Sequence, residues 1–202
     1  MMLLTRVVAP EEHLWLRVCQ ASWSDPLDTS YARVTGGRWN PPDGWDALYV
    51  SRDLPTARMQ VEELADGWFY SVSDLRGDAY ELIGVILPRG MTAVDVVSDD
   101  GVQLAGFLTT YPFDANGDVV SHEKCWPVAQ AGFDRGLDGV EARSARGRDG
   151  SGQEFCWWSR GRPVRARTAR VPMDKWIDDA ITDVRGVLGA LTAEMPDPSS
   201  EE

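Results

Sequence analysis

Lysine, histidine and cysteine are scarce in this sequence of 202 residues. Lysine occurs only at Lys124 and Lys175, so the other 18 of the 20 basic residues are arginines, and 32 acidic residues bring the formal net charge to −12. A uniformly negative surface repels polyanions. We therefore expect no direct binding of nucleic acid and no association with anionic membranes.

The three cysteines, Cys19, Cys125 and Cys156, are odd in number and widely spaced. This pattern argues against a disulfide framework and favours a reducing compartment. No apolar run approaches the roughly 18 residues that a membrane-spanning helix needs. The N-terminal sequence also lacks the charged segment and long apolar segment of a signal peptide. The sequence therefore predicts a cytoplasmic protein.

Most familiar catalytic motifs are absent as well. The sequence contains no P-loop, no G-x-G-x-x-G after a predicted strand and no G-x-S-x-G nucleophile motif. The two histidines, His13 and His122, leave few ways to build a Ser-His-Asp triad. His122 and Cys125 have the spacing of a ligand pair, but two ligands do not make a zinc site. We expect no metal, and the glycine-rich stretch Gly147–Gly152 predicts a hairpin turn.

What is present is a globular composition, with 43% hydrophobic and 26% charged residues. The length fits one domain, which we expect to span residues 1–194. The polar, proline-containing segment 195–202 predicts a disordered tail. Just before it, Met173–Glu194 carries apolar residues at i, i+4, i+8 and i+11 spacing, which predicts one amphipathic helix packed on the core.

Short strands and short helices alternate in the remainder of the chain. We expect strands at His13–Cys19, where a helix beginning near Pro10 is an alternative, and at Ala47–Ser51, Phe69–Val72, Tyr80–Leu87, Val140–Ala142, Glu154–Trp158 and Val164–Val171. We expect helices at Leu54–Ala65, Gly101–Leu108 and Ser121–Phe133. Because no βαβ rhythm repeats, the sequence predicts an α+β fold with short mixed or antiparallel sheets flanked by helices.

The segment Tyr31–Glu63 carries the most specific pattern. Gly36 and Gly37 precede Arg38 in the run GGRWNPP, and the two prolines stiffen the turn that follows. An arginine on such a rigid ledge suits a bidentate contact with phosphate or carboxylate, and Tyr49 on the next strand can stack on a flat heterocycle. A structural turn with an arginine ion pair and a core tyrosine explains the same residues, so residue types alone leave both interpretations open.

This segment resembles the RES-domain proteins, which are the toxin components of RES–Xre toxin–antitoxin pairs. The resemblance rests on GGRWNPP, on the strand ALYVS and on the helix that contains Thr56. Two other segments agree, because HLWLRV at His13–Val18 resembles the opening strand of the family and VEARSA at Val140–Ala145 resembles the strand that delivers its signature serine. The matching blocks cover residues 13–63 and 138–158.

The resemblance implies a compact α+β domain that is related to ADP-ribosyltransferases, takes NAD as its substrate and needs no metal. It implies a cytoplasmic toxin that cleaves the bond between nicotinamide and ribose by hydrolysis or phosphorolysis and is neutralised by an Xre-like helix-turn-helix antitoxin. A homodimer or a toxin–antitoxin hetero-oligomer is the implied assembly. Two alternatives stay open: an ADP-ribosyltransferase that modifies a protein target, and a catalytically silent module that binds NAD.

By position, the resemblance implies roles for individual residues. Arg17 and Arg38 would hold the dinucleotide, Tyr49 would pack against nicotinamide, and Ser144 would hydrogen-bond the ribose or the amide. The implied NAD-binding set is completed by residues next to these positions: Trp39, Asn40 and Arg146.

One position departs from the family. The family usually has a glutamate where this sequence has Gln60, and an amide stabilises a ribosyl cation less well than a carboxylate does. Glu63 lies one helical step further on, at i+3, and can take that role. The predicted catalytic set is therefore Arg38, Tyr49, Gln60, Glu63 and Ser144.

Arginine is concentrated late in the chain. Between Glu141 and Arg170 there are eight arginines and three acidic residues, a local charge of +5 beside −17 for the rest of the chain. This asymmetry predicts a positive cleft around an anionic dinucleotide, with Arg146 as the phosphate ligand. We expect four of the other arginines to lie on solvent-exposed strand faces: Arg162, Arg165, Arg167 and Arg170.

Overall fold

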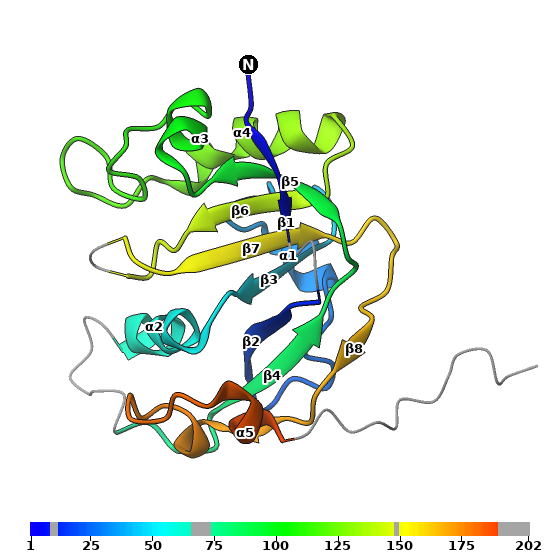
Figure 1. The fold of residues 1–202 in the computed structure, drawn as a ribbon, viewed down its shortest axis with the longest axis vertical. Helices are drawn as coiled ribbons and strands as arrows, with labels where there is room; N and C mark the ends of the chain where they lie inside the picture. The colour runs from blue at the N-terminus through cyan, green and yellow to red at the C-terminus, as the bar shows by residue number, and fades with distance from the viewer. Residues whose placement is uncertain (9–11, 66–73, 148–149, 190–202) are drawn as a thin grey trace, which may run out of the picture.

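The computed structural model describes residues 1–8, 12–65, 74–147 and 150–189. The strands in this part of the chain are β1 (Thr5–Val8), β2 (Leu14–Gln20), β3 (Ala47–Ser51), β4 (Tyr80–Ile86), β5 (Met91–Val96), β6 (Gly139–Arg143), β7 (Gln153–Trp158), β8 (Ala166–Arg167) and β9 (Val171–Pro172). The helices are α1 (Ser30–Thr35), α2 (Leu54–Ala65), α3 (Asp99–Leu104), α4 (His122–Asp134) and α5 (Val184–Leu188), with one 3-10 turn, η2 (Met173–Lys175). In Figure 1, α3 and α4 lie at one end of the molecule, and α2 and α5 lie toward the other.

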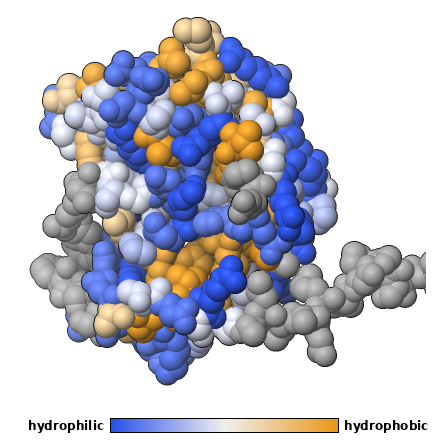
Figure 2. All heavy atoms as spheres, in the orientation of Figure 1, coloured by the Kyte–Doolittle hydropathy of each residue, from blue (hydrophilic) through white to orange (hydrophobic). Residues whose placement is uncertain are grey.

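All of the described strands join one sheet. Their order is β1-β5-β6-β7-β3-β2-β4-β8, and β9 also pairs with β4. The pairs are antiparallel except that β5 and β6 run parallel. This mixed sheet with flanking helices confirms the predicted α+β fold. Figure 2 shows many hydrophilic residues on the face seen in Figure 1, with smaller hydrophobic areas in the upper half of the view and a larger one in the lower half, near β2.

The sheet is weakly joined between β2 and β3. These two strands share one registered pair, Leu16 with Ser51. In contrast, β2 pairs with β4 along its whole length, and β3 pairs with β7 along its whole length. The sheet therefore has two well-paired parts that separate between β2 and β3.

Hydrophobic clusters cover both faces of the sheet. Successive residues of a strand point to opposite faces, so Trp157 and Trp158 of β7 are both buried but belong to different clusters. Trp158 packs in the cluster that includes Val128 of α4. A third cluster joins Val61 of α2 to Trp176 near the C-terminal end of the described chain.

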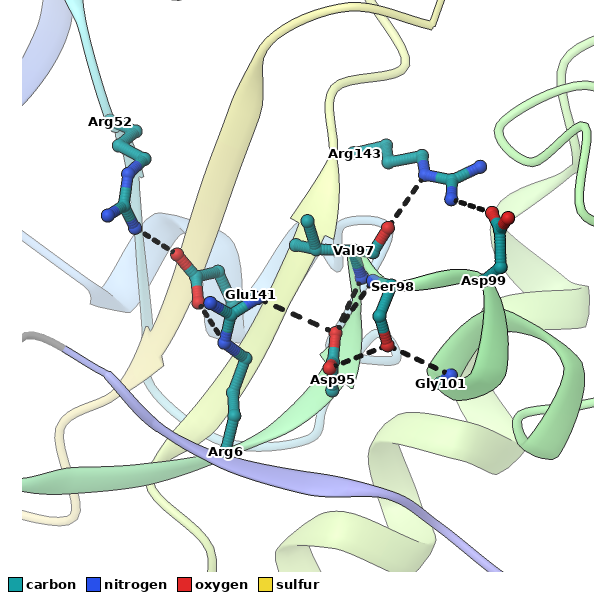
Figure 3. Close-up of polar contacts among 9 residues, drawn as sticks. All are labelled: Arg6, Arg52, Asp95, Val97, Ser98, Asp99, Gly101, Glu141 and Arg143. Atoms are coloured by element: carbon teal, nitrogen blue, oxygen red, sulfur yellow. Dashed lines mark hydrogen bonds and ion pairs between the residues drawn. The ribbon is translucent and has the colours of Figure 1, made fainter.

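A charged network lies on the Trp157 face of the sheet (Figure 3). Glu141 of β6 is fully buried and forms ion pairs with Arg6 at 3.0 Å and Arg52 at 2.7 Å. Asp95, its registered neighbour on β5, accepts hydrogen bonds from two backbone amides and from the hydroxyl of Ser98. The network links β1, β5 and β6 to the residue that follows β3.

The sequence locates most of these elements. The predicted strand Ala47–Ser51 and helix Leu54–Ala65 coincide with β3 and α2, and β2 confirms a strand rather than a helix after His13. The strands β1 and β5 and the helix α1 are not predicted from the sequence, because short apolar runs without a clear period are ambiguous. The predicted strand Phe69–Val72 and the tail 195–202 lie outside the described residues.

The prediction of one continuous strand over Val164–Val171 is wrong. The segment forms two short strands, β8 and β9, which both pair with β4. Between them, the hydroxyl of Thr168 accepts a hydrogen bond from the backbone amide of Gly84 at 2.8 Å. The Thr168 hydroxyl therefore accepts the hydrogen bond that a backbone carbonyl would accept in a continuous strand paired with β4.

The predicted helix Met173–Glu194 is also wrong over its described part, where only η2 and α5 are helical. The buried guanidinium of Arg58 donates to the carbonyl oxygens of Trp176, Asp178 and Ile181, at 3.0, 2.5 and 2.6 Å. These carbonyls turn toward the cation, which interrupts the helical hydrogen-bond pattern. The apolar side chains of the segment nevertheless pack on the core as predicted, and residues 190–194 lie outside the described part.

Candidate functional site

A cleft of about 900 Å³ opens where β2 and β3 separate. Its walls come from β2 and the loop after it, from α1 and the turn at 36–38, from β3, and from the segments on either side of the β6–β7 turn. Helix α2 contributes Glu63, and α4 contributes its first residue, His122. This volume falls in the range of roughly 300–1,000 Å³ that is usual for small-molecule sites.

Arg17 connects the two separating strands at the base of the cleft. Its Nη1 donates to the carbonyl oxygen of Tyr49 at 2.9 Å, and its Nε donates to that of Pro26 at 2.5 Å. The guanidinium also lies 5.6 Å from the ring centroid of Trp23. A half-buried cation thus replaces backbone pairing between β2 and β3, and it keeps further N–H donors for a ligand because a guanidinium has five.

The turn before β3 forms a ledge that the Tyr49 hydroxyl fixes in place. This hydroxyl donates to Asn40 Oδ1 at 2.7 Å and accepts from the backbone amide of Trp39 at 2.8 Å. Asn40 in turn donates to the carbonyl of Ala32 in α1 at 2.6 Å. A Cβ atom on Gly37 would lie 2.5 Å from the Tyr49 hydroxyl, so only glycine fits there. Burial raises the pKa of Tyr49 well above its ordinary value, so the hydroxyl stays protonated.

The ledge presents Arg38 to the cleft. One guanidinium nitrogen donates to the carbonyl of Val120, just before α4, at 2.5 Å. His122 lies close enough to sense this charge, since burial first and Arg38 second lower the pKa of its imidazole. His122 is therefore neutral at neutral pH, and Arg38 is the cation of this wall.

Ser144 and Glu154 meet at the β6–β7 end of the cleft. The buried Ser144 hydroxyl donates to Glu154 Oε1, and it also accepts from the backbone amide of Arg146 at 3.2 Å. Burial raises the pKa of Glu154, while the hydrogen bond from Ser144 and the charges of Arg146 and Arg38 oppose that shift. Glu154 is only partly buried and lines the cleft, whereas Ser144 lies behind it.

Arg146 and Glu63 form an ion pair across the rim of the cleft. The two side chains are 46% and 40% exposed, so water screens much of their attraction, and such pairs are worth about 0–1 kcal/mol. An anionic ligand can therefore compete with Glu63 for Arg146.

Gln60 contacts a residue of β3 and is not among the residues that line the cleft. Its Nε2 donates to the hydroxyl of Ser51 at 2.8 Å. Ser51 is buried and lies directly opposite Glu154 in the β3–β7 register. Gln60 and Glu154 thus both adjoin Ser51.

The structure brings together most of the residues that the sequence selects. Five of them line the cleft: Arg17, Arg38, Tyr49, Glu63 and Arg146. The other four contact or support these walls without lining the cleft: Trp39, Asn40, Gln60 and Ser144. Trp39 is 2% exposed and packs near Phe107 and Tyr111, so it belongs to the core beneath the ledge.

Three residues that line the cleft were not predicted as site residues from the sequence: the acidic residue Glu154, and Trp23 and His122. A signal for Glu154 exists, because in QEFCWW it is the one charged residue and four apolar residues follow it. Residues two apart share a strand face, so Glu154 lies on the same face as Cys156, which pairs with Tyr49.

The prediction of a positive cleft is wrong. Three arginines and four acidic residues line it. Most arginines of the late segment are held elsewhere by local partners, as Arg143 is by Asp99 and Arg162 is by Asp138. Arg170 pairs with Glu81 rather than with solvent alone. Arg146 is the one arginine of the described part of that segment that lines the cleft.

Two negative observations hold for the described residues. They contain no group of three or more histidine, cysteine, aspartate or glutamate side chains placed to hold a metal ion. No helix among them has the length and apolar character needed to cross a membrane.

Comparison with known proteins gives a family match and a structural match. The family model described as RES domain matches residues 14–181. A chain in the crystal structure of the M. tuberculosis MbcT–MbcA toxin–antitoxin complex is similar in fold, with a TM-score of 0.62 and 20% sequence identity over 82% of this chain and 87% of that chain. No curated protein matches the sequence.

Proposed function

Because the chain belongs to the RES domain family, we propose that it is the toxin of a toxin–antitoxin pair and that it cleaves NAD between nicotinamide and ribose. The observation that carries this proposal is the cleft itself, where Arg38 and Tyr49 share one rigid ledge and face Glu154. The similar fold of a chain in a toxin–antitoxin complex supports the toxin assignment.

The residue types suit this reaction. Nicotinamide leaves as a neutral group while positive charge develops on the ribose, so neither a strong nucleophile nor a metal is needed. The protein must orient NAD, hold its pyrophosphate and stabilise the developing charge. Arginine side chains can hold the pyrophosphate, because one guanidinium donates two parallel hydrogen bonds to phosphate oxygens.

Arg17 and Arg38 are the primary dinucleotide ligands in this proposal. Two guanidinium nitrogens of Arg17 donate to carbonyl oxygens, as one of Arg38 does, which fixes the orientation of both side chains. The remaining N–H groups are available to phosphate. Arg146 adds a third contact when the pyrophosphate displaces Glu63.

Tyr49 acts through its ring. Its hydroxyl is occupied by Asn40 and Trp39 on the ledge, so the aromatic face is what it offers to the cleft. A flat nicotinamide ring stacks well on such a face. Ser144 acts through Glu154, whose carboxylate it orients.

The acceptor and the partner complete the proposal. Water or phosphate receives the ADP-ribose, and an Xre-like helix-turn-helix protein is the antitoxin that neutralises this toxin in the cytoplasm. Gln60 favours one other candidate, a silent module that binds NAD, because this amide replaces a carboxylate common in the family. Transfer to a protein would use the same cleft with a different acceptor.

The test is nicotinamide release from NAD by the purified chain. Release by the wild type that falls at least about 100-fold in Arg38→Ala supports the proposal, with Arg135→Ala as the matched control. Arg135 is an exposed arginine at the end of α4 that donates to the Met1 carbonyl. NAD that stays intact but binds measurably would favour the silent module instead.

A further inference from the structure

The cleft has four acidic residues, and three of them already have partners that use their charge or their oxygens. Asp25 accepts from the backbone amide of Leu27 at 2.9 Å, and Asp28 accepts from the amide and hydroxyl of the residue that opens α1. Glu63 is paired with Arg146. The fourth, Glu154, receives one hydrogen bond from the described residues, that of the Ser144 hydroxyl.

Glu154 also differs from the other three acidic residues of the cleft in its position in the sheet. It lies on β7, between β6 and β3, and pairs with Ala142 on one side and Ser51 on the other. Its face of the strand is that of Cys156, which is registered with Tyr49. Glu154 and Tyr49 are therefore diagonal neighbours on one sheet face, at a separation that long side chains bridge.

This placement puts a carboxylate beside the ring on which nicotinamide would stack. The ribose follows nicotinamide in NAD, so its reacting carbon lies within one sugar ring of that stack. The three cleft arginines cannot stabilise a cation there, because like charges repel. A carboxylate stabilises a neighbouring cation most strongly because it carries a full opposite charge. Among the acidic residues that line the cleft, Glu154 is the one on the Tyr49 face of the sheet.

On the basis of the proposed function, we infer that Glu154 is a catalytic residue of the NAD-cleaving reaction, oriented by Ser144. As the bond between ribose C1′ and nicotinamide N1 breaks, both bonding electrons leave with nicotinamide, which becomes neutral. The Glu154 carboxylate faces the positive charge on C1′. A water oxygen then bonds to C1′ and gives one proton to Glu154, which passes it to solvent. The products are nicotinamide, ADP-ribose and a proton.

The surroundings of Glu154 suit a proton acceptor. Burial raises its pKa, which brings it closer to neutral pH than an ordinary glutamate. The hydrogen bond from Ser144 and the charges of Arg146 and Arg38 lower this pKa. The other titratable groups close to Glu154 are Tyr49, Tyr111 and Cys156, whose own pKa values are raised by burial first and by the charge of Glu154 as well. The rate should therefore fall on the acid side as Glu154 takes up its proton.

Glu154→Gln tests this assignment with little change of shape, because an amide oxygen still accepts from Ser144. We expect kcat for nicotinamide release to fall about 100-fold or more while the KM for NAD changes by less than about threefold. The acid limb of the pH–rate profile should vanish in the variant. Glu12→Gln, an exposed carboxylate paired with Arg89, is the control.

The outcomes separate the two proposals. If the wild type cleaves NAD and Glu154→Gln retains its kcat and its acid limb, the role of Glu154 is refuted and the proposed function stands. If the folded wild type leaves NAD intact, both are refuted. Should Glu154→Gln fail to fold, Glu154→Asp takes its place, with an expected fall in kcat and an acid limb shifted to lower pH; an unchanged limb would contradict the assignment.

Discussion

The guanidinium of Arg17 lies 2.9 Å from the carbonyl oxygen of Tyr49, at the point where β2 and β3 stop pairing. The sheet could close here by backbone hydrogen bonds, but a side chain bridges the two strands instead. The cleft follows from this separation. Its two sides are held by Arg17 on β2 and by the ledge that Tyr49 fixes beside β3.

The Arg146–Glu63 ion pair predicts a change in NAD affinity. Glu63→Gln removes the competitor for Arg146, so we expect the KM for NAD to fall about two- to fivefold, which corresponds to roughly 0.4–1 kcal/mol. Steady-state nicotinamide release measures it, and Arg146→Ala should raise the KM. A kcat for Glu63→Gln that fell about 100-fold would instead give Glu63 the role assigned here to Glu154.

The raised pKa of Glu154 predicts how stability depends on pH. Folding raises this pKa, so the folded state binds the proton more tightly than the unfolded chain does. The resulting stabilisation is present in acid and is lost as the pH rises through the folded-state pKa. Glu154→Gln should therefore have a higher Tm than the wild type at neutral pH, and the difference should shrink in acid. A lower Tm for the variant at neutral pH would contradict this.

The position of Gln60 predicts that Gln60→Glu partly restores the activity that Glu154→Gln loses. Gln60 contacts Ser51, which lies opposite Glu154, so Gln60→Glu places a carboxylate next to the position that Glu154→Gln vacates. In the Glu154→Gln background, we expect Gln60→Glu to raise nicotinamide release by about tenfold or more. A double variant no faster than Glu154→Gln alone would show that the two positions are not interchangeable.

The ion pairs around Glu141 predict that a variant at this position is less stable but equally active (Figure 3). Glu141→Gln leaves Arg52 without its carboxylate and leaves Arg6 with Asp95 alone, at 3.7 Å, and both arginines are partly exposed. We expect the free energy of unfolding to fall by roughly 2 kcal/mol in a urea titration. Nicotinamide release per folded molecule should be unchanged, because Glu141 lies on the sheet face opposite Glu154. A variant as stable as the wild type would show that the network contributes little.

Much of the site can be predicted from the sequence because it is built from local signals. Glycines before Arg38, two prolines after Asn40 and a strand carrying Tyr49 fix the ledge within a few residues of chain. The helix Leu54–Ala65 has a proline in its first turn and no competing breaker. These features depend on neighbours in sequence, and the structure has them where predicted.

The remainder depends on contacts between distant segments. Arg58 interrupts the C-terminal helix from about 120 residues away in sequence, and no periodicity shows that a buried cation will take those carbonyls. The local charge of residues 141–170 is likewise a poor guide to the cleft, because Arg162 and Arg170 form ion pairs with Asp138 and Glu81, which lie outside that segment. Glu154 lies in the site because β7 pairs with both β6 and β3. The order of strands in a sheet cannot be predicted from the sequence of one strand.

The proposed activity of the cleft between β2 and β3 is to break the nicotinamide–ribose bond of NAD. Proton NMR of NAD mixed with a catalytic amount of the purified chain measures this directly, since released nicotinamide and the nicotinamide group of intact NAD give separate signals. We expect the signal of free nicotinamide to grow until NAD is exhausted, at a rate proportional to the enzyme concentration, and we expect Tyr49→Ala to abolish this growth. NAD signals that persist unchanged over the folded wild type would contradict it.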